Sequence, residues 1–374
     1  MPGLDSVGQS KVPPRFHSTS CNICYYYSVN LILAGTGDEM LKGGKQMGIL
    51  ARMAAGAILA AVSFTPVSAQ DVTLTLGHVA PPNTSYQAAA ERFAAELSEL
   101  SGGTMSVNIV PGAALGGLSE LWAQTRSSAL DLHLIDIGGV IAMKEGRPFL
   151  VTWAPFLFKD QAHFHRFTES DLFDELMGGL EESTGIKYLG YVGDRPPRIV
   201  TTADTPVAKP DDLKGLKIRT PQHPFVIAAF EAWGASSAPI GAAELLIALK
   251  TGVVDGQDNG VTDFIGGGYA EANKHLTPIN YILSGLGVWM SPAKWAEMSE
   301  EQRGWLMQAA TRAGIEGKKL HEAEVAAAFN QLDALGVTVT EPDIDAFRAA
   351  IEPWIKGTDG KAWPAGQYDL INSL

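Results

Sequence analysis

Strand-like and helix-like segments alternate along this chain from residue 71 onward, and this alternation constrains its fold more than any other feature. Polar and apolar residues alternate over residues 71–77, as in a half-buried strand, and apolar residues then recur at helical spacing over residues 86–100. Further strands are predicted over residues 105–110 and 130–135, with a helix over 118–129 between them. This order predicts an α/β fold whose parallel strands are joined by crossover helices.

A second α/β unit follows in the second half of the chain. Strands are predicted near residues 198–202, 216–219 and 236–240, and helices over 225–233 and 242–251. A long alanine-rich helical segment, broken at Gly314 and Gly317, is predicted over residues 300–335, and a shorter helix over 344–355. The 374 residues suffice for two domains. Because ligand pockets favour domain interfaces, we expect two α/β lobes with a ligand-binding cleft between them.

The N-terminal segment is predicted to direct export. An apolar run over residues 53–62 is preceded by Lys42, Lys45 and Arg52 and followed by the small residues Ser68 and Ala69. This pattern is typical of a signal peptide, here residues 47–69 with cleavage after Ala69, and the run is too short to span a bilayer comfortably. The alternative is an amphipathic or buried helix. Residues 1–46 are interpreted as an over-called extension upstream of a start at Met47 or Met40.

Cysteine usage and charge exclude several classes of protein. Cys21 and Cys24 both precede the predicted cleavage site, so the mature chain contains no cysteine and needs no disulfide. The whole chain has a net charge of −13, and removal of residues 1–69 leaves 23 basic and 38 acidic residues, a net charge of −15. A nucleic-acid-binding protein needs a basic surface, which this composition does not supply.

No motif in the sequence indicates catalysis, a cofactor or a metal site. His163 and His165 are two residues apart, a spacing at which helical side chains diverge. His321 lacks a second histidine at the spacing that a zinc protease needs. The run Gly266-Gly267-Gly268 is not followed by the Lys-Ser/Thr of a phosphate-binding loop and is interpreted as a flexible helix entry. An enzyme is therefore the weaker hypothesis.

Two polar segments, 35 to 40 residues apart, indicate carboxylate binding. Arg219 ends an apolar strand and is followed by Thr220 and Pro221, which prevent an immediate helix. A guanidinium at a strand end can hold a carboxylate with two parallel hydrogen bonds. Asn259 follows the turn-forming Asp255-Gly256 and can donate to or accept from the same ligand. For Arg219 alone, a surface ion pair is the alternative interpretation.

These segments, Leu-Lys-Gly-Leu-Lys-Ile-Arg over 213–219 and Val-Asp-Gly-Gln-Asp-Asn over 254–259, resemble a known family. It is the extracytoplasmic solute receptors of tripartite ATP-independent periplasmic (TRAP) transporters, of the dicarboxylate (DctP) and sialate type. The resemblance covers residues 71–356 and includes Pro-Phe-Leu-Phe over 155–158 and Arg-Ile-Val-Thr-Thr over 198–202. It implies a two-lobed periplasmic-binding-protein fold of type II. Lobe I would contain residues 71–193 plus about 283–320, and lobe II residues 194–282 plus about 321–374.

The resemblance also implies which residues bind the ligand. Arg219 would form the main salt bridge to a carboxylate, with polar contacts from Arg198 and Asn259. Because Asp194-Arg195-Pro196-Pro197 looks like an insertion, either Arg195 or Arg198 can be the residue that reaches the pocket, and Arg198 is favoured for its place next to the strand. The remaining candidates are Asp136, His78, Gln222, Gln257 and Phe264. Residues 240–243 are small where relatives carry an aromatic wall, which predicts either a wider pocket or room for aromatic side chains such as Phe225 or Phe264 to enter it.

The expected function is that of a periplasmic binding protein, not an enzyme, that needs no cofactor. It would capture a small organic acid and deliver it, as a monomer, to the small and large subunits of a sodium-driven TRAP permease. A carboxylate at Asp136 would repel an acid ligand unless it binds ligand hydroxyls, which favours a sugar acid or hydroxy acid. The alternatives are a ligand-sensing partner of a membrane signalling receptor and, less favoured, a periplasmic hydrolase.

Overall fold

The computed structural model describes residues 71–374, and two β-sheets organise this part of the chain. The first sheet has the strand order β2-β1-β3-β10-β4. Its strands are β1 (Val72–Gly77), β2 (Met105–Val110), β3 (Leu132–Asp136), β4 (Lys187–Arg195) and β10 (Ser284–Met290). β1 pairs in parallel with β2 and β3, whereas β10 runs antiparallel to β3 and β4. The predicted parallel, crossover-connected arrangement is therefore confirmed for β1, β2 and β3.

The second sheet has the order β11-β9-β5-β8-β6-β7. Its strands are β5 (Arg198–Thr202), β6 (Lys217–Thr220), β7 (Ser236–Pro239), β8 (Gly256–Gly260), β9 (His275–Thr277) and β11 (Thr338–Val339). The chain passes to this sheet between β4 and β5 and returns to the first sheet between β9 and β10. Since only Pro196 and Pro197 separate β4 from β5, the ends of these two strands bring their polar residues close together.

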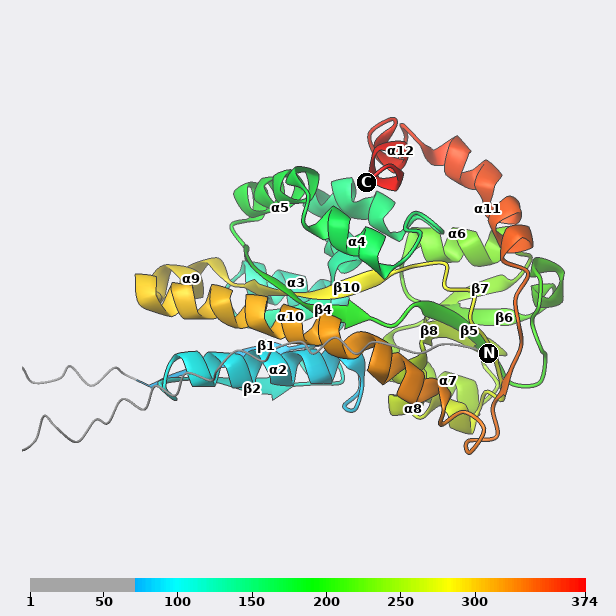
Figure 1. Ribbon diagram of the computed structural model, residues 1–374, viewed down its shortest axis with the longest axis horizontal. Helices are drawn as coiled ribbons and strands as arrows, with labels where there is room; N and C mark the ends of the chain where they lie inside the picture. Colours follow the sequence, from blue (N-terminus) through cyan, green and yellow to red (C-terminus); the bar gives the residue numbers. More distant parts are fainter. Residues whose placement is uncertain (1–70) are drawn as a thin grey trace, which may run out of the picture. The chain divides into compact units, whose positions relative to one another are not determined.

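Helices cover both faces of the first sheet (Figure 1). On one face, α2 (Ser85–Leu100) and the long α10 (Glu300–Phe329) pack on the strands through a cluster that includes Phe93, Leu97 and Leu306. The opposite face is covered by α3 (Leu118–Arg126), the 3-10 segments η1 (Ile137–Ala142) and η2 (Lys144–Trp153), α4 (Gln161–Thr168) and α5 (Asp171–Thr184). Apolar faces of sheet and helices thus meet in layers, as expected of an α/β fold.

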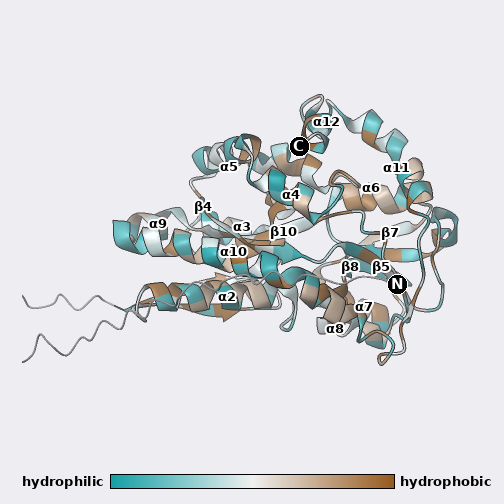
Figure 2. Ribbon diagram, viewed as in Figure 1, coloured by the Kyte–Doolittle hydropathy of each residue, from teal (hydrophilic) through white to brown (hydrophobic). Residues whose placement is uncertain are grey.

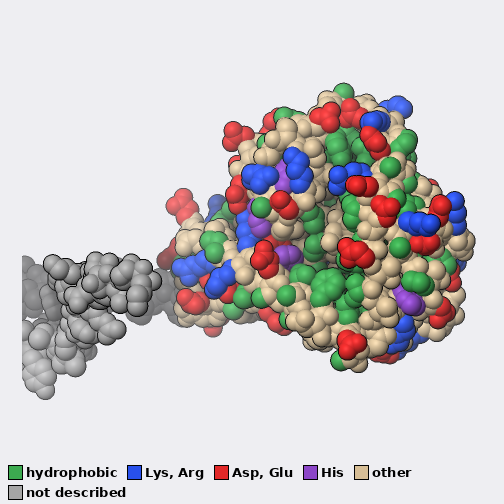
Figure 3. Space-filling view, turned by 45° about the vertical axis from the view of Figure 1, so that its right-hand side comes forward, with side chains coloured by type: hydrophobic (Ala, Val, Ile, Leu, Met, Phe, Trp, Pro, Cys, Tyr) green, Lys and Arg blue, Asp and Glu red, His purple; other side chains and the backbone are tan. Residues whose placement is uncertain are grey.

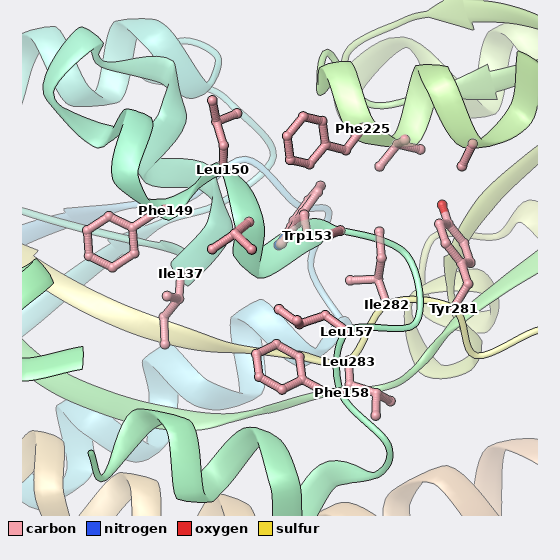
Figure 4. Close-up of a cluster of buried hydrophobic side chains, with 14 of the residues drawn as sticks. Ile137, Phe149, Leu150, Trp153, Leu157, Phe158, Phe225, Tyr281, Ile282 and Leu283 are labelled. Atoms are coloured by element: carbon pink, nitrogen blue, oxygen red, sulfur yellow. The ribbon is translucent and has the colours of Figure 1, made fainter. Parts of the chain in front are cut away.

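The second sheet is covered in the same way. Phe225 and Phe230 of α6 (Pro224–Ala232) extend the apolar cluster of the first sheet, and the chain crossing at Tyr281 and Ile282 joins it (Figure 4). The other face packs against α7 (Leu245–Lys250), α8 (Val261–Gly266) and the end of α10. Short elements complete this part: η3 (Pro210–Leu213), η4 (Ala242–Glu244) and η5 (Tyr269–Glu271). Figure 2 shows α6 largely in hydrophobic shades and hydrophilic residues recurring along α10.

Three further helices lie near the C-terminus: α9 (Pro292–Glu297), α11 (Ile344–Thr358) and α12 (Gln367–Asn372). In α11, the Phe347 carbonyl accepts a hydrogen bond from Trp233 Nε1 at 2.9 Å. In α12, the Ile371 carbonyl lies 2.8 Å from His163 Nε2, and Asn372 donates to the Leu157 carbonyl at 2.7 Å. The contacts of α12 are therefore with residues before 193, and the lobe boundaries predicted from the sequence stay a prediction.

Most predicted elements are present, with two corrections. The predicted helix over 242–251 is divided into η4 and α7, and the segment from residue 300 is not broken at its glycines, because α10 continues through Gly314 and Gly317. These glycines instead permit close packing: a Cβ on Gly314 would lie 2.4 Å from the Tyr191 carbonyl oxygen, and one on Gly317 would lie 2.7 Å from Gly193 Cα. Tight packing on β4 outweighs the low helix propensity of glycine.

Several predictions concern residues outside the described part of the chain. They are the extension over 1–46, the signal peptide over 47–69 and the Cys21–Cys24 pair. Within residues 71–374, every helix is too short or too polar to cross a lipid bilayer.

Candidate ligand-binding cavity

A cavity of about 460 Å³ lies between the elements of the two sheets. The first sheet contributes the end of β3, the last residue of β4, the loop after β1 and the N-terminal ends of α2 and α3. The second sheet contributes residues of β5, β6 and β8 and the segment between β7 and α7. The volume is within the range of small-molecule sites, and the position between two sheets matches the cleft expected from the sequence.

Three buried arginines line this cavity. Arg195 is the last residue of β4, Arg198 the first of β5, and Arg219 lies in β6. Each is only 3–4% exposed. Burial of a guanidinium is unfavourable unless a carboxylate or several acceptors compensate its charge, so the partners of each arginine decide what it can bind.

Arg195 is bound through both of its terminal nitrogens by side chains from elements of both sheets. Its Nη1 donates to Asp136 Oδ2 at 3.1 Å, and its Nη2 donates to Asp263 Oδ2 and to Asn259 Oδ1, each at 2.8 Å. The guanidinium also lies 5.1 Å from the ring centre of Tyr86. Both Arg195 and Arg198 therefore reach the cavity, but Arg195 is already bound by two aspartates.

The charge of Arg198 is compensated by one aspartate, Asp258. Its Nε donates to Asp258 Oδ2 at 2.5 Å, and the same oxygen accepts a hydrogen bond from the Tyr281 hydroxyl at 2.6 Å. Burial alone would lower the pKa of Arg198, but the Asp258 carboxylate outweighs it and raises this pKa. On its cavity side the guanidinium lies 5.1 Å from the Trp153 ring centre, a cation–π contact.

Arg219 differs from the other two arginines. Its Nε donates to the Ile240 carbonyl at 2.8 Å, but within residues 71–374 no carboxylate pairs with it and its two terminal nitrogens make no hydrogen bond. Burial consequently lowers the pKa of the Arg219 guanidinium from 12.5 to about 10, an effect that Asp258 only partly offsets. At neutral pH the group is still charged, and it supplies the cavity with a cation that lacks a counter-ion.

Asp136 lines the cavity as expected, but its carboxylate is already saturated. Oδ1 accepts hydrogen bonds from Gly138 N at 2.9 Å and Trp153 Nε1 at 2.8 Å. Oδ2 accepts from Arg195 Nη1 and from Ser284 Oγ, the latter at 2.6 Å. With four donors already in place, Asp136 positions its neighbours and has little capacity left for ligand hydroxyls.

Asp263, which the sequence analysis missed, ties the two sides of the cavity together. Its Oδ1 accepts hydrogen bonds from the backbone nitrogen of Ser85 at 3.0 Å and from Ser85 Oγ at 2.7 Å, while Oδ2 accepts from Arg195. Ser85 begins α2 and Asp263 lies in α8, so this single carboxylate links elements that belong to different sheets.

Of the other predicted residues, Asn259 and Gln222 line the cavity, and three do not. Because Arg195 Nη2 can only donate, the side-chain oxygen of Asn259 accepts this hydrogen bond, and Asn259 Nδ2 is left as a donor toward the cavity. The three remaining residues serve elsewhere. His78 Nε2 lies 2.9 Å from Gln87 Oε1, Gln257 donates to Thr201 Oγ1 at 2.8 Å, and Phe264 is fully buried in the core next to the second sheet.

Two tyrosines that the sequence analysis did not single out as ligand-binding residues also line the cavity. Tyr86 lies at the start of α2 and Tyr269 begins η5. Burial raises the pKa of each hydroxyl to about 12, so both are neutral at physiological pH. Neither hydroxyl has a hydrogen-bond partner among the described residues. The small residues 240–243 line the cavity too, and the wider pocket expected from them stays a prediction.

A second cavity, of about 270 Å³, has Glu91 and Glu324 but no arginine or lysine in the described part of its lining. Among residues 71–374, no three His, Cys, Asp or Glu side chains are grouped so that they could hold a metal ion. On the face drawn in Figure 3, acidic and basic side chains are interspersed and do not gather by sign. The polar cavity with its uncompensated Arg219 is therefore the candidate site.

Comparisons with known proteins identify the family of the chain. Residues 76–359 match the model of the DctP family, described as bacterial extracellular solute-binding protein, family 7. The 2,3-diketo-L-gulonate-binding periplasmic protein of Escherichia coli is 30% identical over 317 residues, which cover 84% of this chain and 94% of the relative. The sialic acid-binding periplasmic protein of Vibrio cholerae is 27% identical, covering 77% and 88% respectively.

Solved structures share the fold. A TRAP periplasmic solute-binding protein from Bordetella, whose bound density is interpreted as pantoate, superposes with a TM-score of 0.73 at 26% identity, covering 80% of this chain and 98% of that one. Another from a Polaromonas species, bound to D-erythronate, gives a TM-score of 0.75 at 24% identity, covering 81% and 99%. The α/β fold expected from the sequence is thereby confirmed.

Proposed function

The chain belongs to family 7 of the bacterial extracellular solute-binding proteins, the DctP family of TRAP transporter receptors, and we propose that it captures a hydroxylated monocarboxylate in the cavity at Arg219. This family consists of binding proteins, not enzymes.

The observation that carries this proposal is the uncompensated charge of Arg219. Arg195 faces two aspartates and Arg198 faces one, so their charges are already balanced or exceeded. Within residues 71–374, Arg219 has only a backbone carbonyl as partner. A single ligand carboxylate would supply the missing counter-ion and accept two parallel hydrogen bonds from the guanidinium. Among the described residues that line the cavity, no second uncompensated cation is present for another ligand carboxylate, which favours a monocarboxylate over a dicarboxylate.

The free donors around the cavity favour a ligand with hydroxyl groups. The Asn259 amide and the hydroxyls of Tyr86 and Tyr269 line the cavity, and none of the described residues accepts a hydrogen bond from them. A polar ligand would pair with them, whereas an apolar acid would leave them buried and unsatisfied, at about 1–3 kcal/mol for each group. Several solved relatives contain sugar acids, among them D-erythronate, L-galactonate and D-glucuronate.

The transport role rests on the family and on the sequence pattern of the N-terminus. We propose that residues 47–69 are removed on export to the periplasm, that the two sheets belong to two lobes which close around the acid, and that the monomer delivers it to the small and large subunits of a sodium-driven permease. The Ser85–Asp263 hydrogen bonds are suited to the closed state, because they join elements from opposite sides of the cavity. Ligand contacts to both sides would shift the equilibrium toward closure.

Calorimetry with matched ligands tests the proposal. The mature protein, unfolded and refolded to remove bound acids, is titrated with galactonate, with the neutral galactonamide and with galactitol, and the series is repeated with erythronate. Binding of either acid, with its neutral counterparts at least 100-fold weaker, supports the carboxylate anchor. If galactonamide or galactitol bound as tightly as galactonate, the carboxylate anchor would be refuted. Arg126→Met, at an exposed arginine, serves as the control variant and should bind as the wild type does.

A further inference from the structure

The run Gly266-Gly267-Gly268 has a structural reason at each position, unlike the flexible helix entry that the sequence suggested. A Cβ on Gly266 would lie 1.9 Å from the carbonyl oxygen of Asn83, in the loop before α2. A Cβ on Gly267 would lie 2.6 Å from Cζ of Tyr269. Gly268 has a φ of 73°, the left-handed conformation that favours glycine. The three glycines therefore let the chain turn after α8 and let the Tyr269 ring pack directly over the backbone.

This turn holds Tyr269 at the cavity. The side chain lines the cavity although the residue is only 1% exposed, and its hydroxyl has no hydrogen-bond partner within residues 71–374. Among the charged groups around it, Arg219 has the strongest effect on the pKa of Tyr269, and Tyr269 in turn affects the pKa of Arg219. Ile240, whose carbonyl accepts a hydrogen bond from Arg219 Nε, packs against the apolar cluster that contains Tyr269, so the Tyr269 hydroxyl and the Arg219 guanidinium lie on the same side of the cavity.

Tyr86 provides an internal contrast. It too lines the cavity with a free hydroxyl, but its ring lies under Arg195, at 5.1 Å, and Arg195 has the strongest charge effect on its pKa. Because two aspartates already compensate the charge of Arg195, this arginine does not attract a ligand carboxylate. An acid anchored at Arg219 would therefore meet Tyr269 near its carboxylate end and Tyr86 farther along.

Building on the proposed function, we propose that Tyr269 is a specificity-determining residue that donates a hydrogen bond to the hydroxyl on the carbon next to the ligand carboxylate. The two terminal nitrogens of Arg219 would donate hydrogen bonds to the two oxygens of the ligand carboxylate. The next ligand group that a neighbouring donor can reach is then the substituent on carbon 2, next to the carboxylate. The cavity then selects 2-hydroxy acids over their 2-deoxy counterparts. A site built to pair with a ligand hydroxyl rejects an analogue that lacks it, because its own polar group is left unpaired.

The test compares Tyr269→Phe with the matched variant Tyr86→Phe. Phenylalanine keeps the ring that packs on Gly267 and removes only the hydroxyl. Calorimetry measures D-erythronate and D-galactonate against 3,4-dihydroxybutanoate and 2-deoxygalactonate. We expect the wild type and Tyr86→Phe to prefer the 2-hydroxy acid about 10-fold. Tyr269→Phe should lose this preference, by weaker binding of the 2-hydroxy acid and, because no hydroxyl is left unpaired, by binding of the 2-deoxy acid that is at least as tight as in the wild type.

The outcomes separate this inference from the proposed function. A Tyr269→Phe variant that keeps the preference, or that binds both acids equally more weakly, overturns the role of the hydroxyl while leaving the anchor at Arg219 intact. So does a wild type that binds both acids alike. A wild type that binds none of the acids contradicts the proposed function and the inference together. Gly267→Ala, which displaces the ring, should also abolish the preference, and thermal unfolding of each variant monitors its fold.

Discussion

Replacing Arg219 by methionine should stabilise the ligand-free protein and weaken acid binding by at least about 100-fold. A pKa of about 10 in place of 12.5 means that the charged group is less favourable in the folded than in the unfolded chain. At 1.36 kcal/mol for each unit of pKa, the difference is roughly 3 kcal/mol. Because the pKa of this base is lowered, the destabilisation is fully present at pH 7 and disappears only above pH 10.

The net gain is smaller, because Arg219→Met also removes a hydrogen bond. The bond from Nε to the Ile240 carbonyl is worth about 1 kcal/mol, which leaves a gain of about 2 kcal/mol. For a domain of this size, that corresponds to an increase in Tm of about 4 °C. Binding of galactonate should weaken roughly 100- to 5,000-fold, since a buried ligand carboxylate without its partner costs about 3–5 kcal/mol.

Arg198→Met is the informative contrast. It leaves Asp258, which is fully buried, with the Tyr281 hydroxyl as its remaining side-chain partner and should destabilise the protein by about 3–5 kcal/mol. Scanning calorimetry of refolded, ligand-free proteins measures both variants, because residual acid would stabilise the wild type alone. If Arg219→Met lowered Tm by several degrees, or bound galactonate within 3-fold of the wild type, Arg219 would be a structural residue and the reasoning would be refuted.

Three further predictions follow from single contacts. Gly138→Ala should destabilise the protein by about 1–3 kcal/mol in urea unfolding, since a Cβ would lie 2.0 Å from Trp153 Nε1, and an unchanged midpoint would contradict this packing. Burial lowers the pKa of His133 to about 3, so protonation of this histidine favours the unfolded chain. The free energy of unfolding should therefore fall from pH 6.5 toward pH 3 by up to about 1.4 kcal/mol per pH unit, and less steeply in His133→Gln. Equal slopes in the two proteins would rule out His133 as a cause of this pH dependence. Asp263→Asn weakens the link to Ser85, and we expect about 10-fold weaker acid binding and a larger radius of gyration by X-ray scattering; unchanged values would mean that this contact does not hold the two sides together.

Local sequence patterns were sufficient to predict the class of fold and much of the site. Strand and helix periods identified β1, α2 and β2 closely, because half-buried strands and amphipathic helices show their apolar faces in the sequence itself. Arg219, Arg198 and Asn259 were predicted from the strand ends and from a family resemblance, and all three line the cavity. The 3-10 segment that carries Trp153 has no such period, so its position at the cavity could not be predicted.

The sequence by itself determined that strands, helices and a set of polar strand ends would build an α/β fold with an arginine-lined cavity. Only the tertiary structure decided what each arginine can do. In the sequence, Arg195 and Arg198 look as able to bind an acid as Arg219 does. In the folded protein, Asp136 and Asp263 pair with Arg195, and Asp258 pairs with Arg198, from positions up to 68 residues away in the chain. Whether a buried charge is compensated depends on distances of a few ångströms between such segments, and those distances are set by packing.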